Sequence, residues 1–131
     1  MATTDSPQVG EVMTDGSLYA GTSPDTGKPM FTTSKNAAGR TLAWKAAMAL
    51  AANLDAHGHR DWRVPTKGEL EALFRLRVAI GGFRISGPNA AGWYWSSSQE
   101  IDGTVWGQHF SDGLQISYGK LINSSLRCVR G

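Results

Sequence analysis

The sequence contains a single cysteine, Cys128, among its 131 residues. An intramolecular disulfide is therefore impossible, and the fold has to be held together by side-chain packing. Hydrophobic residues make up 40% of the chain, which lies in the globular range and above that of disordered chains. The length is sufficient for one domain with its own core and too short for two. We expect a single domain over residues 9–131.

The sequence also has no long apolar run and no large excess of either positive or negative residues. No stretch approaches the ~20 apolar residues that a membrane-spanning helix needs, so we expect no membrane insertion. Residues 1–8 have neither the basic start nor the apolar centre of a signal peptide, and we expect them to form a polar arm. The 13 basic and 11 acidic residues are interspersed, which argues against a nucleic-acid-binding face.

Turn sequences predict several short strands near the N-terminus. Residues 9–13 alternate in character, Asp15-Gly16 follows, and a second apolar run covers residues 18–20. Because both turn residues tolerate positive φ, this order predicts a β-hairpin. A Pro-Asp-Thr-Gly turn at residues 24–27 then precedes a further strand at residues 30–32.

Two helices are expected in the middle of the chain. Residues 41–54 are helix formers throughout, and we expect this helix to end near His57-Gly58. Its apolar stripe consists of Trp44, Ala47, Met48 and Ala51. The second helix begins with a capping box, Thr66-x-x-Glu69, and Gly81-Gly82 ends it. Its predicted buried stripe consists of Leu70, Leu73, Phe74 and Val78.

In the last third of the sequence the hydrophobic period changes to two. The predicted strands cover residues 93–98, 104–110, 114–118 and 125–130, with Asp-Gly turns at 102–103 and 112–113. Helices and strands are thus segregated along the chain, which predicts an α+β fold. Trp106 and Phe110 lie on one strand face by parity and are expected to point inward. Of Trp93, Tyr94 and Trp95, we expect Tyr94 to be the most exposed.

Polar residues around the helices offer few candidates for chemistry. Two histidines, His57 and His59, lie between Asp55 and Asp61, a spacing that can bind zinc, but a polar loop at a helix end is the favoured explanation. Arg63, Asp61 and Glu69 are expected to form a structural ionic network. The serine run at residues 96–98 has no neighbouring His-Asp pattern that would activate a nucleophile. We expect no metal, no cofactor and no catalysis.

Four motifs resemble, in the same order, a bacterial and phage domain family of uncharacterised function. They are DWRVPTKGELEALF, GWYWSSS, FSDG and SLRCVRG, within residues 60–131. The family also forms the C-terminal domain of certain collagen-like adhesins. The resemblance implies a C-type-lectin-like fold, in which two helices pack on a twisted antiparallel sheet behind an N-terminal hairpin. It also implies that the last strands and loops carry a ligand surface, as in retroelement-diversified variable proteins.

Parts of the sequence also resemble two related protein groups that have a known chemistry. The RVPTKGELE segment resembles the sulfatase-modifying, formylglycine-generating enzymes, but these hold copper with a cysteine pair and this chain has only Cys128. The calcium-dependent lectins place carboxylates around a Glu-Pro-Asn motif. The nearest match here, Gly87-Pro88-Asn89, has glycine where the carboxylate is needed. A divergent enzyme of the first group is the least favoured alternative.

The predicted ligand surface consists of polar side chains on the final strands and turns. These residues are Tyr94, Gln99, Glu100, Asp102, Thr104, Gln108, His109, Ser111, Gln115, Ser117, Tyr118 and Asn123. We expect a recognition or adhesion module for a host-surface glycan or protein, carried on a phage or prophage tail. The lack of a signal peptide fits a virion or export outside the Sec route. The alternative function is assembly, as a homo-oligomer or as part of a larger phage particle.

Overall fold

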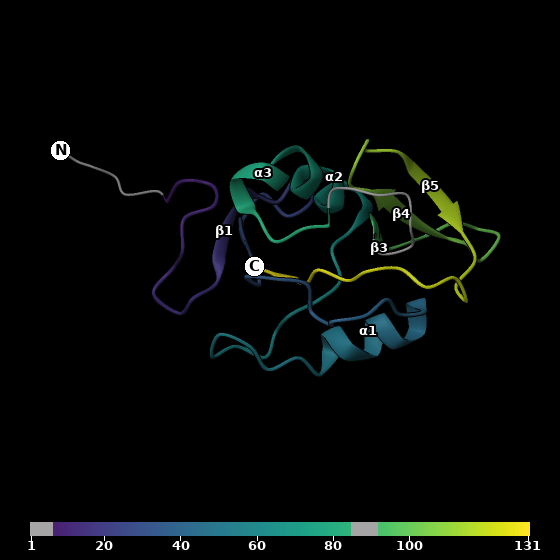
Figure 1. The fold of residues 1–131 in the computed structure, drawn as a ribbon, viewed down its shortest axis with the longest axis horizontal. Helices are drawn as coiled ribbons and strands as arrows, with labels where there is room; N and C mark the ends of the chain where they lie inside the picture. The colour runs from purple at the N-terminus through teal and green to yellow at the C-terminus, as the bar shows by residue number, and fades with distance from the viewer. Residues whose placement is uncertain (1–6, 85–91) are drawn as a thin grey trace.

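The computed structural model describes residues 7–84 and 92–131, which form two three-stranded antiparallel sheets and three helices (Figure 1). The first sheet contains β1 (Leu18–Thr22), β2 (Pro29–Thr32) and β6 (Val129–Arg130). The second contains β3 (Trp93–Gln99), β4 (Val105–His109) and β5 (Gln115–Tyr118). The helices are α1 (Trp44–Ala52), α2 (Lys67–Arg75) and α3 (Arg77–Ile80). The predicted α+β class is confirmed, with two sheets in place of the one expected.

The N-terminal hairpin lies one turn later than predicted. β1 and β2 pair across the residue 24–27 turn, whereas the segment before Asp15-Gly16 meets β1 through a single bridge between Val12 and Leu18. Gly10 has a φ of 88°, which bends the chain out of an extended conformation. Residues 9–13 therefore form no strand.

The first helix ends earlier than its sequence predicts. α1 stops at Ala52, and Asn53 caps it by donating from Nδ2 to the carbonyl of Ala49 at 2.9 Å. A short polar side chain that bonds the backbone in this way competes with further helix. His57 consequently lies in a separate turn, with a φ of 55°, and not at the helix end.

The capping box of the second helix is confirmed. Thr66 accepts from the amide of Glu69, and the Glu69 side chain accepts from the amide of Thr66. The helix is interrupted at Leu76, which rotates the following residues around the axis. Val78 is therefore 81% exposed, contrary to the prediction, and Ile80 is buried in its place.

The middle of β3 is buried on both faces, because α1 and α2 lie on opposite sides of the fold (Figure 1), whereas β5 at the edge of the sheet stays partly exposed. The adjacent residues Tyr94 and Trp95 point to opposite faces of β3, and both are fully buried. Trp95 belongs to a core with α1, whereas Tyr94 and Phe110 belong to a core with α2 and β2. Trp106 and Phe110 were both expected to point inward. Phe110, directly after β4, is buried, and Trp106 on β4 is half-buried. The expectation that Tyr94 is the most exposed of its neighbours is wrong.

The C-terminal segment runs between the two cores, in yellow in Figure 1. Residues 124–129 are all buried. Only Val129–Arg130 form a strand, and the predicted strand over 125–130 is otherwise an extended chain with isolated bridges from Ser124 to Leu42 and from Ser125 to Tyr94. This segment joins α1, β3 and β2, because its successive side chains alternate between the two cores.

Candidate ligand-binding site

Two of the predicted site residues are enclosed inside the fold. Tyr94 Oη donates to Oδ1 of Asn36 and accepts from the amide of Arg84, each at 2.8 Å. Gln108 is also fully buried, and its Nε2 donates to Oε1 of Glu71 at 2.6 Å and to the carbonyl of Gly113 at 3.0 Å. Neither side chain forms part of the surface, so both expectations of direct ligand contact are corrected.

Three further predicted site residues make contacts inside the fold, while part of each side chain stays exposed to solvent. Gln115 Nε2 donates to the carbonyl of Lys67 at 3.2 Å. The ring of Tyr118 stacks on Trp95 with 4.8 Å between centroids, its hydroxyl bonds Ser124, and burial raises its pKa to about 12. His109 lies against Trp93, with 4.9 Å between ring centroids. These groups stabilise the second sheet.

The predicted residues in the β3–β4 connection support a turn. Asp102 Oδ1 accepts from the amide and the hydroxyl of Thr104, at 2.9 and 2.6 Å, and these hydrogen bonds lower the pKa of the Asp102 carboxyl. Glu100 accepts from Trp106 Nε1 at 3.0 Å. The geometry is that of an Asx turn, which fixes the backbone without any ligand.

The remaining predicted residues are accessible but do not converge. Gln99, Ser111 and Asn123 are exposed, and Ser117 is half-buried. Asn123, together with Tyr118, lines a cavity of about 290 Å³ that we call the apolar groove. The groove is lined by Trp93, Ile116, Tyr118, Ile122, Asn123 and Ser124. The polar strand surface therefore contributes two of its predicted residues to a largely apolar cavity.

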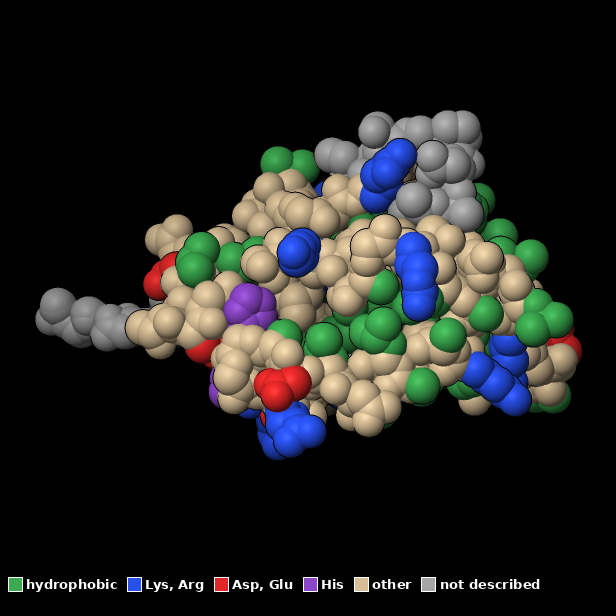
Figure 2. All heavy atoms as spheres, turned by 60° about the horizontal axis from the view of Figure 1, so that its bottom comes forward, with side chains coloured by type: hydrophobic (Ala, Val, Ile, Leu, Met, Phe, Trp, Pro, Cys, Tyr) green, Lys and Arg blue, Asp and Glu red, His purple; other side chains and the backbone are tan. Residues whose placement is uncertain are grey.

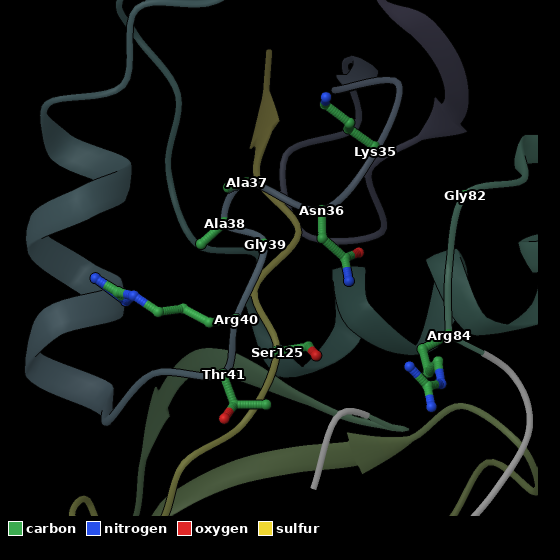
Figure 3. Close-up of a pocket in the computed structure, with 10 residues that line it drawn as sticks. All are labelled: Lys35, Asn36, Ala37, Ala38, Gly39, Arg40, Thr41, Gly82, Arg84 and Ser125. Carbon is green, nitrogen blue, oxygen red and sulfur yellow. The ribbon is translucent and has the colours of Figure 1, made fainter.

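A larger cavity, of about 500 Å³, opens between the segment before α1 and the segment after α3 (Figure 3). We call it the basic pocket, and its lining residues are Lys35, Asn36, Ala37, Ala38, Gly39, Arg40, Thr41, Gly82, Arg84 and Ser125. Three of them are cationic and none is acidic. The side chains of Asn36, Ser125 and Arg84 point toward the same space, whereas Arg40 extends away toward α1 and Lys35 extends away from the other three at the rim of the pocket (Figure 3).

The wider surface carries scattered charges. In Figure 2, separate lysine and arginine side chains are spread over a mostly uncharged face, and the acidic side chains in view lie toward its edges. Sequence reasoning missed the pocket because its basic residues are separated by up to 49 positions, from Lys35 to Arg84. The available clue was the run Lys-Asn-Ala-Ala-Gly-Arg at residues 35–40, where small residues separate two cations.

The buried tyrosine connects the core to this pocket. Tyr94 Oη bonds both the Asn36 side chain and the Arg84 backbone, two lining residues that are far apart in the sequence. Since Tyr94 donates to Oδ1 of Asn36, the Nδ2 group of that amide is left to donate elsewhere. Tyr94 thus has a positioning role for the pocket, which is different from the ligand contact predicted for it.

Comparison with known proteins identifies the family of this chain. The profile of the Lcl C-terminal domain family matches residues 22–130. The chain belongs to that family. A search of the curated proteins finds no match. In this Lcl C-terminal domain the match includes the β2 strand and α1, so it extends well before the four motifs that carried the resemblance.

The other candidate residues of this Lcl C-terminal domain have structural partners. His59 Nε2 contacts Oδ2 of Asp15 at 2.8 Å, and His57 Nδ1 lies 3.1 Å from the Asp15 carbonyl. Within residues 7–84 and 92–131, no three His, Cys, Asp or Glu side chains lie close enough together to hold a metal ion. Gly87-Pro88-Asn89 lies outside the described residues.

The predicted ionic network is divided into two pairs. Glu69 is fully buried and accepts two hydrogen bonds from Arg63, at 2.6 and 2.8 Å, and one from Ser23 at 2.6 Å. Burial alone would raise the pKa of the Glu69 carboxyl, but these donors and the Thr66 amide outweigh it and lower the pKa to about 2. Asp61 instead pairs with Arg130 at 2.7 Å.

The serine run and the cysteine are likewise part of the framework. Ser96 donates to the carbonyl of Trp106 at 2.6 Å, and Ser98 accepts from the amide of Lys67 at 2.9 Å. Cys128 is fully buried, and burial raises the pKa of its thiol to about 12. None of the helices in the described ranges has the length and apolar character required to cross a membrane.

Proposed function

We propose that this domain is a non-enzymatic recognition and adhesion module that binds its ligand in the basic pocket. The observation that carries the proposal is a concave site of about 500 Å³ with three cationic and several hydrogen-bonding side chains. Pockets of this size, with a few convergent polar groups, are the usual form of ligand sites. The family's occurrence in collagen-like adhesins, which the sequence resemblance implies, supports adhesion as the role.

The ligand class that fits is a host-surface glycan or protein with acidic groups. Lys35 and Arg84 are exposed loop residues, so they can adapt to a ligand without disturbing the core. Hydroxyls and an amide lie beside them, and this mixture suits a ligand rich in oxygen atoms. A C-type-lectin-like presentation of ligand, and a place on a phage or prophage tail, are the finer parts of this proposal.

Glycan and protein arrays probed with the labelled domain test the proposal. We expect binding by the unaltered domain, loss of binding in the double variant Lys35→Gln and Arg84→Gln, and full retention in Arg60→Gln. Arg60 is a suitable control because its side chain is 81% exposed and lies outside the pocket. A ligand whose binding survives the double variant would contradict the proposed site.

A second candidate function, self-assembly, is favoured by one observation. Exposed aliphatic side chains gather on and near β5, where Ile116 and Ile122 line the apolar groove. Their exposed fractions are 41% and 54%, and Leu121 beside them is 90% exposed. Exposed apolar patches commonly mark contact surfaces. Sedimentation equilibrium would detect a homo-oligomer, and Ile122→Ser would be expected to dissociate it.

A further inference from the structure

The basic pocket has a fourth cation directly behind its wall. Arg127, on the buried C-terminal segment, is 0% exposed. Its Nε donates to the carbonyl of Thr33 at 2.9 Å and its Nη2 to the carbonyl of Gly81 at 3.1 Å. Its Nη1 has no hydrogen-bond partner, and no ion pair to it occurs within residues 7–84 and 92–131.

The position of Gly82 relates this guanidinium to the pocket. Gly82 lines the pocket and has a φ of 82°, a conformation that favours glycine. A Cβ atom added there would lie 3.1 Å from Arg127 Nη1 and 2.7 Å from the Ser34 carbonyl. A single glycine residue, without a side chain, thus separates the buried charge from the cavity.

A buried cation without a carboxylate needs stabilisation from elsewhere. Burial lowers the pKa of the Arg127 guanidinium to about 10, so the group remains charged at neutral pH. Among the described residues, the groups that face it are the carbonyls of Thr33 and Gly81, the ring of Phe83 at 4.1 Å, and the neutral Tyr94 and Cys128. None of them carries a negative charge at neutral pH, so the positive potential of Arg127 extends into the pocket.

We propose that the basic pocket binds one carboxylate group of an acidic ligand, held between Arg84 and the Asn36 amide, with Arg127 as the buried charge that selects an anion. A carboxylate has two oxygens in one plane, which matches the planar guanidinium of Arg84 and the planar amide of Asn36 on the facing segment. Tyr94 fixes both elements, as its hydroxyl bonds Asn36 and the Arg84 backbone. This inference rests on the proposed function, since it assigns the ligand chemistry of the same pocket.

A titration with sodium glucuronate and with glucose, followed by amide NMR signals, tests it, because the two sugars differ by the carboxylate. We expect glucuronate to shift the signals of residues 35–41 and 82–84, to shift the Arg127 Nε–H signal, and to lose affinity as salt is raised. Glucose should leave these signals in place. Arg84→Gln should weaken glucuronate binding about tenfold, which corresponds to about 1.4 kcal/mol, and Arg60→Gln should not change it.

The outcomes separate the two proposals. If array ligands bind through the pocket but glucuronate and glucose behave alike, the carboxylate inference fails and the proposed function stands. If glucose 6-sulfate binds as tightly as glucuronate, the preference for a planar carboxylate is overturned. If no ligand depends on Lys35 and Arg84, both proposals fail. All these variants change exposed side chains, so the tests do not require substitution of the buried Arg127.

Discussion

The polar surface of β3, β4 and β5 and the basic pocket differ in what their polar side chains bind. On the strands, Gln108, Gln115 and Tyr118 bond other parts of the fold, and the β3–β4 turn residues bond one another. In the pocket, Lys35 and Arg84 are exposed, and the buried Tyr94 bonds Asn36 and the Arg84 backbone. Polar composition therefore does not locate a ligand site, because polar side chains on partly buried strands can bond other parts of the fold.

The largest expected effect comes from removing the buried carboxylate that ties the hairpin to α2. Glu69→Ala would leave Arg63 without its partner and Ser23 without its acceptor. Loss of one member of a fully buried pair costs about 3–5 kcal/mol in the free energy of unfolding, and because the Arg63 side chain is 35% exposed we expect about 3 kcal/mol here. Urea unfolding measures it, with the exposed Glu11→Ala as a control that should change stability by less than about 0.5 kcal/mol. An equal effect of both changes would contradict the role of Glu69.

The same carboxylate predicts a loss of stability in acid. Its pKa is about 2 in the folded protein, against an ordinary value of 4.5. A carboxyl with a depressed pKa contributes stability above its ordinary pKa, and this contribution is lost as the pH falls toward the folded value. Thermal unfolding between pH 6 and pH 2 should therefore show a falling midpoint below about pH 4.5. The decline should be shallower in Glu69→Gln, and identical curves would contradict the assignment.

Gln108→Ala tests the internal role of the strand surface. The substitution leaves Glu71 Oε1 and the Gly113 carbonyl without the Gln108 donor, while Arg75 still donates to Glu71 Oε2. The loss should cost about 1–3 kcal/mol in unfolding free energy. Ligand affinity of the folded variant should not change. Gln99→Ala, on the exposed end of the same sheet, should alter neither quantity. A loss of affinity without loss of stability in Gln108→Ala would restore it as a ligand contact.

A matched pair of tyrosine variants sharpens the comparison further. Tyr94→Phe and Tyr118→Phe each remove one buried or half-buried hydroxyl, and each should cost about 1 kcal/mol of stability. Only Tyr94→Phe releases Asn36 and the Arg84 backbone. It should weaken glucuronate binding severalfold, and Tyr118→Phe should leave it unchanged. Equal affinities in the two variants would remove the positioning role of Tyr94.

The sequence predicted local features better than surfaces. The Thr66–Glu69 capping box and the turns at residues 102–103 and 112–113 were predicted because each depends on a few neighbouring residues. Gly103 and Gly113 both have a φ of 86°, as such turns require. The break at Leu76 and the early end of α1 were missed, although the second has a local cause, the Asn53 side chain that bonds the Ala49 carbonyl.

The ligand site could not be predicted because it depends on long-range packing. Alternation along β3 showed that Tyr94 and Trp95 point to opposite faces, but not that both faces are covered. Covering both requires α1, α2 and the C-terminal segment to pack around the sheet. The same packing brings Lys35 and Arg84 to one cavity, a proximity that their positions in the sequence do not indicate.

The most direct test compares glucuronate affinity in two double variants, one for each region. Lys35→Gln with Arg84→Gln alters the basic pocket, and Gln99→Ala with Asn123→Ala alters exposed residues of the strand surface. NMR titration of both should show lost binding in the pocket variant and unchanged binding in the strand variant. Unchanged binding in the pocket variant, with loss in the strand variant, would contradict the placement of the ligand site.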